Sequence, residues 1–159
     1  MKKYLSLLNK PTWILRIFSF KKVPMIFYTR PWIQDLSLSK IEVVIPLNRK
    51  TKNHLNSMYF GALCVGADVA GGFLALSIIQ NKKKDVSIIF KDFKAEFLKR
   101  PEDNVHFYCE DGQIINVAID KAISTSERCN VPITIKAMVP IIDLEPVAIF
   151  SLTLSLKSK

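Results

Sequence analysis

The stretch that decides the fold is residues 57–79, SMYFGALCVGADVAGGFLALSII. It contains four of the five glycines of the chain, and Asp68 is its only charged residue. Its length alone would allow a membrane span. Glycine, however, costs up to about 1 kcal/mol relative to alanine in a helix, and a carboxylate near the bilayer centre costs about 3 kcal/mol. We therefore predict a helix buried on almost every side and kept thin by glycine and alanine, so that a sheet can wrap around it.

Alternating apolar and polar residues predict one strand before this helix and four strands after it. These strands cover residues 41–47, 86–97, 105–109, 131–139 and 147–156. In the first strand after the helix, the alternation shifts phase around Lys91 and Asp92, which predicts a β-bulge. Residues 113–125 return to helical spacing and predict a short helix between strands.

Residues 1–38 are predicted to form an N-terminal helical lead, packed on a single domain that spans residues 39–159. Apolar residues recur in the lead at helical spacing. They are Leu5, Leu8, Trp13, Ile14, Ile17 and Phe18. The apolar stretch 13–20 contains Arg16 and is too short to cross a membrane. Two interpretations stay open: a helix packed on the flank of the domain, and an amphipathic helix that binds a membrane surface.

The composition indicates a globular chain with a core of its own. The 159 residues suit one domain, and 49% of them are hydrophobic. The 23 Lys and Arg residues outnumber the 14 Asp and Glu residues, and the net charge of +9 favours anionic partners. Nucleic acid is not expected among them, because no recognition motif is present. Three cysteines at unrelated spacings indicate a reducing compartment, so we expect a cytoplasmic protein. Two histidines exclude a multi-histidine metal site, and we expect no metal or other cofactor.

Several short motifs resemble a known superfamily. Asn53, Gly61 and the run Ala67-Asp68-Val69-Ala70 resemble the active-site helix of PaaI-like acyl-CoA thioesterases. The stretch 93–101, FKAEFLKRP, is similar to a strand of that superfamily that ends in a basic residue and proline. The lead and the helix at 113–125 resemble a branch classed as a domain of unknown function. The resemblance implies an α+β hotdog fold, in which an antiparallel sheet wraps around one long helix. It also implies a homodimer, or a tetramer, with the acyl site between subunits.

The resemblance implies hydrolysis of an acyl-CoA or another acyl thioester, which needs a group that activates water or attacks the carbonyl, and donors for the oxyanion. Asp68 is the candidate base or nucleophile, because a lone carboxylate in an uncharged helix must be paired, face a cavity or have a raised pKa. The backbone N–H of Gly61, and that of Ala62 after it, are candidate oxyanion donors, because the start of a helix leaves N–H groups unpaired. The alternative for Asp68 is a structural carboxylate satisfied by its neighbours.

Further candidate contacts lie just before the helix. Asn53 would orient water or substrate, or it is a turn residue. Thioesterases of this type carry His-Gly where this chain has Tyr59 and Phe60, while His54 could offer an imidazole from another position. This departure favours an alternative function, a non-catalytic protein that binds acyl chains or acyl thioesters. Basic residues could hold the phosphates of coenzyme A, or could simply form a solvated face. They are Arg49, Lys50, Lys52, Lys82, Lys83, Lys84, Lys99 and Arg100.

Overall fold

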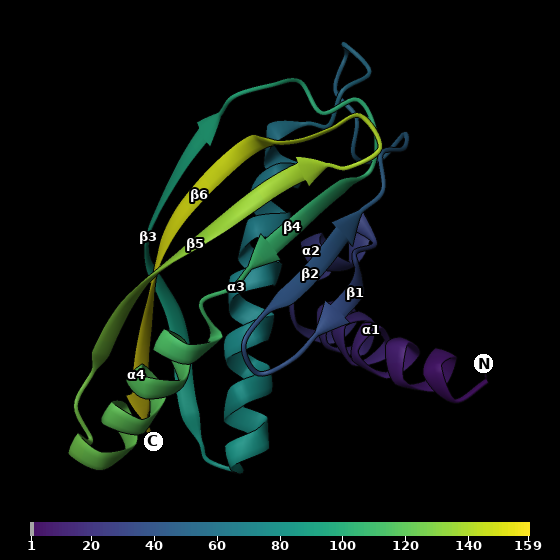
Figure 1. The fold of residues 1–159 in the computed structure, drawn as a ribbon. Helices are drawn as coiled ribbons and strands as arrows, with labels where there is room; N and C mark the ends of the chain where they lie inside the picture. Colours follow the sequence, from purple (N-terminus) through teal and green to yellow (C-terminus); the bar gives the residue numbers. More distant parts are fainter. Residues whose placement is uncertain (1) are drawn as a thin grey trace.

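The computed structural model describes residues 2–159, with side chains from Lys10 onward. Within these residues the chain forms four helices and six strands (Figure 1). In chain order they are α1 (Lys2–Lys22), α2 (Pro24–Thr29), β1 (Trp32–Leu36), β2 (Ile41–Ile45), α3 (Phe60–Lys82), β3 (Val86–Phe97), β4 (Val105–Cys109), α4 (Gly112–Thr125), β5 (Cys129–Val139) and β6 (Asp143–Ser158). The side chains of Leu5 and Leu8, which the sequence placed on the lead helix, lie outside the described residues.

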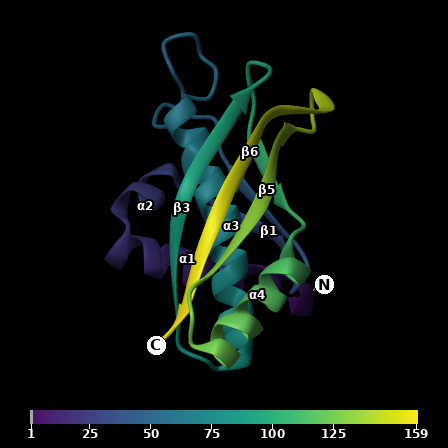
Figure 2. The ribbon, with the colours of Figure 1, turned by 90° about the vertical axis from the view of Figure 1, so that its left-hand side faces the viewer.

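The six strands form one antiparallel sheet in the order β1-β2-β4-β5-β6-β3. The sheet curves around α3, with α1 and α2 beyond one side of that helix and α4 beyond the other (Figure 2). The predicted strands after the long helix are confirmed, and the register of β3 against β6 shifts between Phe90 and Asp92, where the sequence predicts the bulge.

Helix α3 forms the centre of the core, as predicted. By length and composition it could cross a membrane, but 67% of its most apolar window is buried inside the protein, so it is the core helix of the domain. Gly66 shows why small residues are needed here. A Cβ added to Gly66 would lie 2.2 Å from the ring of Phe107 on β4, so only glycine lets the sheet approach the helix this closely.

The lead is not helical throughout, which corrects the predicted helical segment 1–38. The second helix ends at Thr29, and the residue that caps it, Arg30, has a left-handed φ of 52°. Pro31 then follows, and residues around a proline favour extended backbone. β1 begins at Trp32 and pairs with β2, and its Ile33 is buried in the core. The short segment has only one fully buried apolar residue, so its alternation was too weak to indicate a strand.

The first helix packs against the domain through one face only. Leu15 and Ser19 are buried, and the backbone N–H of Ile33 donates a 3.0 Å hydrogen bond to the hydroxyl of Thr12. α1 lies beside α2, and α2 lies against α3 (Figure 2). This contact places residues of the lead next to the middle of the core helix.

Candidate functional site

Asp68 faces a cavity of about 430 Å³. One wall of the cavity comes from the N-terminal lead, through Leu15, Phe18, Val23 and Ile26. The remaining walls come from α3, from the first half of β3 and from the last residue of the chain. Asp68, Ser87 and Lys159 are the only polar side chains among the described lining residues, so Asp68 lies in a largely apolar space.

No neighbour among residues 10–159 pairs with the carboxylate of Asp68. Burial raises the pKa of Asp68 above its ordinary value, since a charged carboxylate loses hydration in apolar surroundings. Within residues 10–159 no hydrogen bond or ion pair reaches this side chain. Of the alternatives weighed from the sequence, the geometry matches a carboxylate that faces a cavity with a raised pKa. Such a group can accept a proton from water or attack an electrophile.

The start of α3 uses some of its N–H groups internally. The carbonyl of Tyr59 accepts hydrogen bonds from the N–H groups of Ala62 at 2.9 Å and Leu63 at 3.2 Å. The predicted role of Ala62 as an oxyanion donor is therefore corrected, because its N–H is already paired. The N–H groups of Phe60 and Gly61 precede this first helical bond, and no described backbone carbonyl accepts from them. Within the described part of the chain, they are the donors that the helix start leaves free.

The ring of Tyr59 covers Gly61. A Cβ at Gly61 would lie 2.4 Å from Cε1 of Tyr59, so the glycine makes room for this ring. Tyr59 also packs on Phe60, with ring centroids 4.8 Å apart, and Phe60 meets Phe97 of β3 at 6.1 Å. Tyr59 and Phe60 are both exposed. The residues that replace His-Gly thus form an aromatic surface over the candidate donors.

Gly61 and Asp68 lie too far apart in one copy to act on the same carbonyl. Seven residues of α-helix make nearly two turns and a rise of about 10.5 Å, so both residues are on one face but well separated. The cavity at Asp68 is accordingly not lined by Gly61. A reacting carbonyl must lie about 3 Å from both the base and the oxyanion donors.

The loop before α3 holds Asn53 in a structural role. Its Oδ1 accepts hydrogen bonds from the N–H groups of Leu55 at 2.9 Å and Ser57 at 3.2 Å, which is the pattern of a turn residue. The side chain of Arg100 donates to the carbonyl of Leu55 at 3.2 Å and fastens the loop to the end of β3. His54 is exposed on the same loop. These residues gather near the start of α3, and none of them lines the cavity at Asp68.

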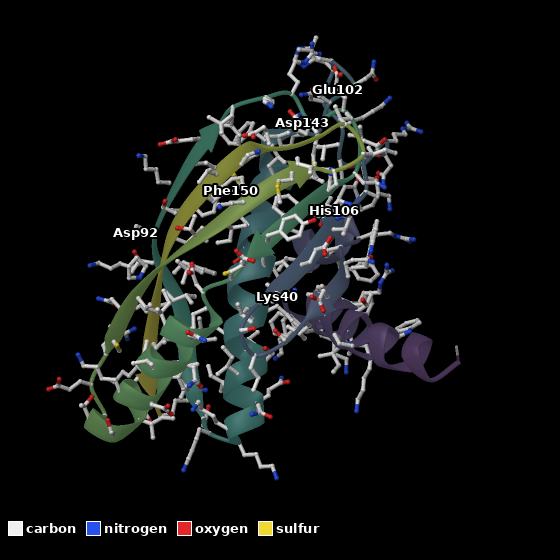
Figure 3. All side chains as sticks on the ribbon, in the orientation of Figure 1. Lys40, Asp92, Glu102, His106, Asp143 and Phe150 are labelled. Carbon is white, nitrogen blue, oxygen red and sulfur yellow. The ribbon has the colours of Figure 1, made fainter. Side chains whose placement is uncertain are left out.

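Two of the basic candidates are engaged in ion pairs. Lys99 contacts Asp143 at 2.5 Å, and Lys82 contacts Asp120 at 2.7 Å. The hydrogen bond from Lys99 lowers the pKa of Asp143 below its usual range. Figure 3 shows Asp143 at the same end of the sheet as Glu102, far along the strand from Phe150. This pair lies on the surface of the turn rather than at the cavity.

The three cysteines are free, and two of them have raised pKa values. Burial raises the pKa of Cys64, and it raises the pKa of Cys109 to about 11. Neither thiol is therefore suited to act as a nucleophile at neutral pH. Within the described residues, no group of three or more His, Cys, Asp or Glu side chains could hold a metal ion.

Sequence reasoning missed two groupings. One is the contribution of the lead to the cavity, for which only the apolar spacing of Leu15 and Phe18 gave a signal. The other joins β2 to β4, where Glu42 contacts Nδ1 of His106 at 2.6 Å and accepts from the hydroxyl of Tyr108 at 3.0 Å (Figure 3 labels His106). Glu42 is more than sixty positions from both His106 and Tyr108, so only the pairing of the two strands brings it to them.

Comparison with known proteins identifies the family. A family model described as "Domain of unknown function (DUF4442)" matches residues 12–138. The chain belongs to this family. No curated protein matches the sequence of this DUF4442 protein.

Solved structures match the DUF4442 protein over nearly its full length. A Chlorobaculum tepidum protein of unknown function gives a TM-score of 0.79 at 12% identity and covers 96% of this chain and 97% of its own. A Pseudomonas aeruginosa protein of unknown function, described as a probable thioesterase, gives a TM-score of 0.76 at 20% identity. The match covers 94% of this chain and 97% of that protein. A Haemophilus influenzae thioesterase gives a TM-score of 0.63 at 12% identity. The match covers 89% of this chain and 88% of that protein. These likenesses confirm the predicted α+β hotdog fold.

Proposed function

We propose that this DUF4442 protein hydrolyses acyl thioesters, with acyl-CoA as the substrate class. The observation that carries the proposal is Asp68, a carboxylate without a described partner that faces an apolar cavity of about 430 Å³. Cavities of roughly 300–1,000 Å³ are typical of small-molecule sites. A fatty-acyl chain fits the apolar walls, and the carboxylate supplies the reactive group.

Asp68 would act on the thioester carbonyl in one of two ways. As a base, the carboxylate takes a proton from water, and the hydroxide adds to the carbonyl carbon. As a nucleophile, it adds to the carbon directly and forms an anhydride, which water then cleaves. In both cases the C–S bond breaks, the free acid forms, and the sulfur leaves as a thiol after gaining a proton. A raised pKa favours proton transfer, since a base works best near the working pH.

The oxyanion donors would come from a second copy of the chain. Phe60 and Gly61 lie about 12 and about 10.5 Å from Asp68 along the same helix. A shared site needs the donor N–H groups and the carboxylate within about 3 Å of one carbonyl. β3 is an edge strand with no partner strand on its outer side among the described residues, and it exposes Ile89 and Phe97. Pairing of two such edges would give a homodimer with joined sheets, as the resemblance implies.

Hydrolysis of an acyl-CoA panel tests the role of Asp68. We expect the wild type to release free coenzyme A, and Asp68→Asn to lower kcat by at least about a hundredfold. Glu127→Gln is the control, because Glu127 is an exposed carboxylate outside β3 and away from the cavity lining. Full activity of Asp68→Asn would refute the role of this residue.

Mixed dimers test the shared site. Gly61→Pro removes the candidate donor, and proline is tolerated in the first turn of a helix. The exposed ring of Tyr59 must move aside for the added side chain. If each site combines Asp68 of one copy with Gly61 of the other, mixing inactive Asp68→Asn with inactive Gly61→Pro gives one intact site per mixed dimer. A random mixture would recover up to about a quarter of wild-type activity. No recovery, with mixed dimers present by mass spectrometry, would refute a site shared between copies.

A second candidate function is supported by Tyr59 and Phe60. Their aromatic rings cover the helix start where thioesterases of this type carry His-Gly, and Tyr59 lies over Gly61. A protein that binds acyl chains or acyl thioesters without cleaving them would keep the cavity and need no accessible donor. Native mass spectrometry separates the two functions: a retained acyl-CoA without turnover favours binding, and turnover favours hydrolysis.

A further inference from the structure

The outer face of the N-terminal lead carries large apolar side chains in solvent. Trp13, Ile17 and Phe20 follow one another at i, i+4 and i+7 on α1, and they are 62%, 55% and 65% exposed. The opposite face of the same helix packs into the domain through Leu15 and Ser19. The helix therefore has one face for the core and a second apolar face without a described partner.

This second face continues onto α2. Phe20 and Phe27 make an edge-to-face contact with ring centroids 5.2 Å apart. Met25 and Tyr28 on α2 are 69% and 56% exposed. We call Trp13, Ile17, Phe20, Met25 and Tyr28 the lead surface. An exposed apolar patch of this kind, on a helix held in place, marks an interaction site.

The charged residues of α1 are all basic, and α2 contains no charged residue. Residues 1–34 contain seven Lys and Arg residues, and the first acidic residue of the chain is Asp35. Arg16 and Lys21 line a surface groove of about 340 Å³ together with Trp13, Ile17, Phe20 and Phe27. Cations beside tryptophan and phenylalanine are the pattern of a helix that lies in the interface of a membrane. Anionic headgroups complement the cations, and the acyl region accommodates the rings.

We propose that the lead surface binds the surface of an anionic phospholipid bilayer. Phe18 and Val23 connect this surface to the cavity, because both are exposed and both line the cavity at Asp68. Binding at the lead surface would thus hold the cavity next to the bilayer, where molecules with long acyl chains collect. Membrane binding does not depend on hydrolysis, and it is measured without turnover.

Co-sedimentation with vesicles tests the proposal. The full chain is mixed with vesicles of phosphatidylcholine alone and with vesicles that also contain phosphatidylglycerol. We expect binding to the anionic vesicles, weaker binding to the neutral ones, and a decrease as salt is raised. Phe20→Glu should weaken binding at least about tenfold. Ile142→Glu is the matched control, because Ile142 is equally exposed in the distant β5–β6 turn, and it should bind as the wild type does.

A charge-matched pair separates the lead from the general positive charge. Lys21→Glu with Lys22→Glu should weaken binding at least about tenfold, and Lys83→Glu with Lys84→Glu, after the end of α3, should have little effect. Equal losses from the two double variants would show that net charge alone drives binding and would overturn the proposal. Absence of wild-type binding to anionic vesicles would also overturn it.

Tryptophan fluorescence reports on the lead surface itself. Trp32→Phe leaves Trp13 as the single tryptophan of the chain. We expect its emission to shift to the blue on addition of anionic vesicles. A second copy of the chain is the other occupant to test. Sedimentation velocity shows whether Phe20→Glu dissociates an oligomer. If it does, and the wild type does not bind vesicles, the lead surface is a contact between copies and the proposal is wrong.

Discussion

Gly66→Ala tests the close contact that positions the core helix. A Cβ at this position would lie 2.2, 2.3 and 2.6 Å from three ring atoms of Phe107, which is fully buried. Ordinary contacts are about 3.5 Å or more, so the ring or the helix must move by about 1 Å. Overpacking of this kind costs about 3 kcal/mol at the upper end of its usual range. Alanine recovers about 1 kcal/mol through its helix propensity, which leaves a net loss of about 2 kcal/mol.

Gly72→Ala is the matched control on the same helix. Its added Cβ would lie 3.6 and 3.7 Å from the ring of Phe90, which is ordinary contact, so helix propensity should dominate. We expect Gly72→Ala to gain up to about 1 kcal/mol. Thermal unfolding should separate the two variants, because the midpoint of Gly66→Ala should be lower than that of the wild type by about 4–8 °C. If both variants shift the midpoint in the same direction, the close approach of Phe107 does not control the packing of α3.

Three further predictions concern ionisable groups. Burial raises the pKa of Asp68 in the native state, so unfolding free energy falls as pH rises from the unfolded to the native pKa. Asp68→Asn removes this fall. In urea unfolding, the variant should have a higher unfolding free energy than the wild type at about pH 7 but not at about pH 3. The pKa of Asp143 is lowered chiefly by its hydrogen bond from Lys99, so any stabilisation is present above the unfolded pKa and is lost as pH falls through the native one. Because this pair is exposed, Asp143→Asn should leave the denaturation midpoint unchanged. Burial raises the pKa of Cys109 to about 11, so iodoacetamide near neutral pH should label this thiol only after unfolding, as peptide mass spectrometry would show.

The sequence predicts the central helix and its strands well, because each has a strong periodic pattern. The small-residue run of α3 and the clean alternation of β6 are both local signals of burial. Even the bulge near Asp92 is visible as a change of phase. β1 was not predicted, because its five residues are stabilised by pairing with β2 and have no clear alternation of their own. A strand of this kind is defined by its neighbour, and no local rule identifies it.

The candidate site is less predictable than the fold for a related reason. Asp68 stands out in the sequence, since it is a single charge in an apolar helix. The roles of Asn53 and Ala62 are set by hydrogen bonds whose partners the sequence does not indicate. Asn53 stabilises the loop, and the N–H of Ala62 is paired with the carbonyl of Tyr59. Spacing placed Gly61 near Asp68 along the chain, but the rise of the helix keeps the two apart. A residue spacing shared with a family therefore identifies the helix and not a completed site.

The N-terminal lead connects these observations. Leu15 and Ile26 are buried and line the cavity, so the wall opposite Asp68 is built partly by the lead. Without that wall, the carboxylate would face open solvent, and the burial that raises its pKa would be smaller. α1, the helix that carries Leu15, exposes Trp13 and Phe20 on its outer face. The lead is thus both a wall of the cavity and an apolar surface with basic neighbours, and α1 contributes residues to both.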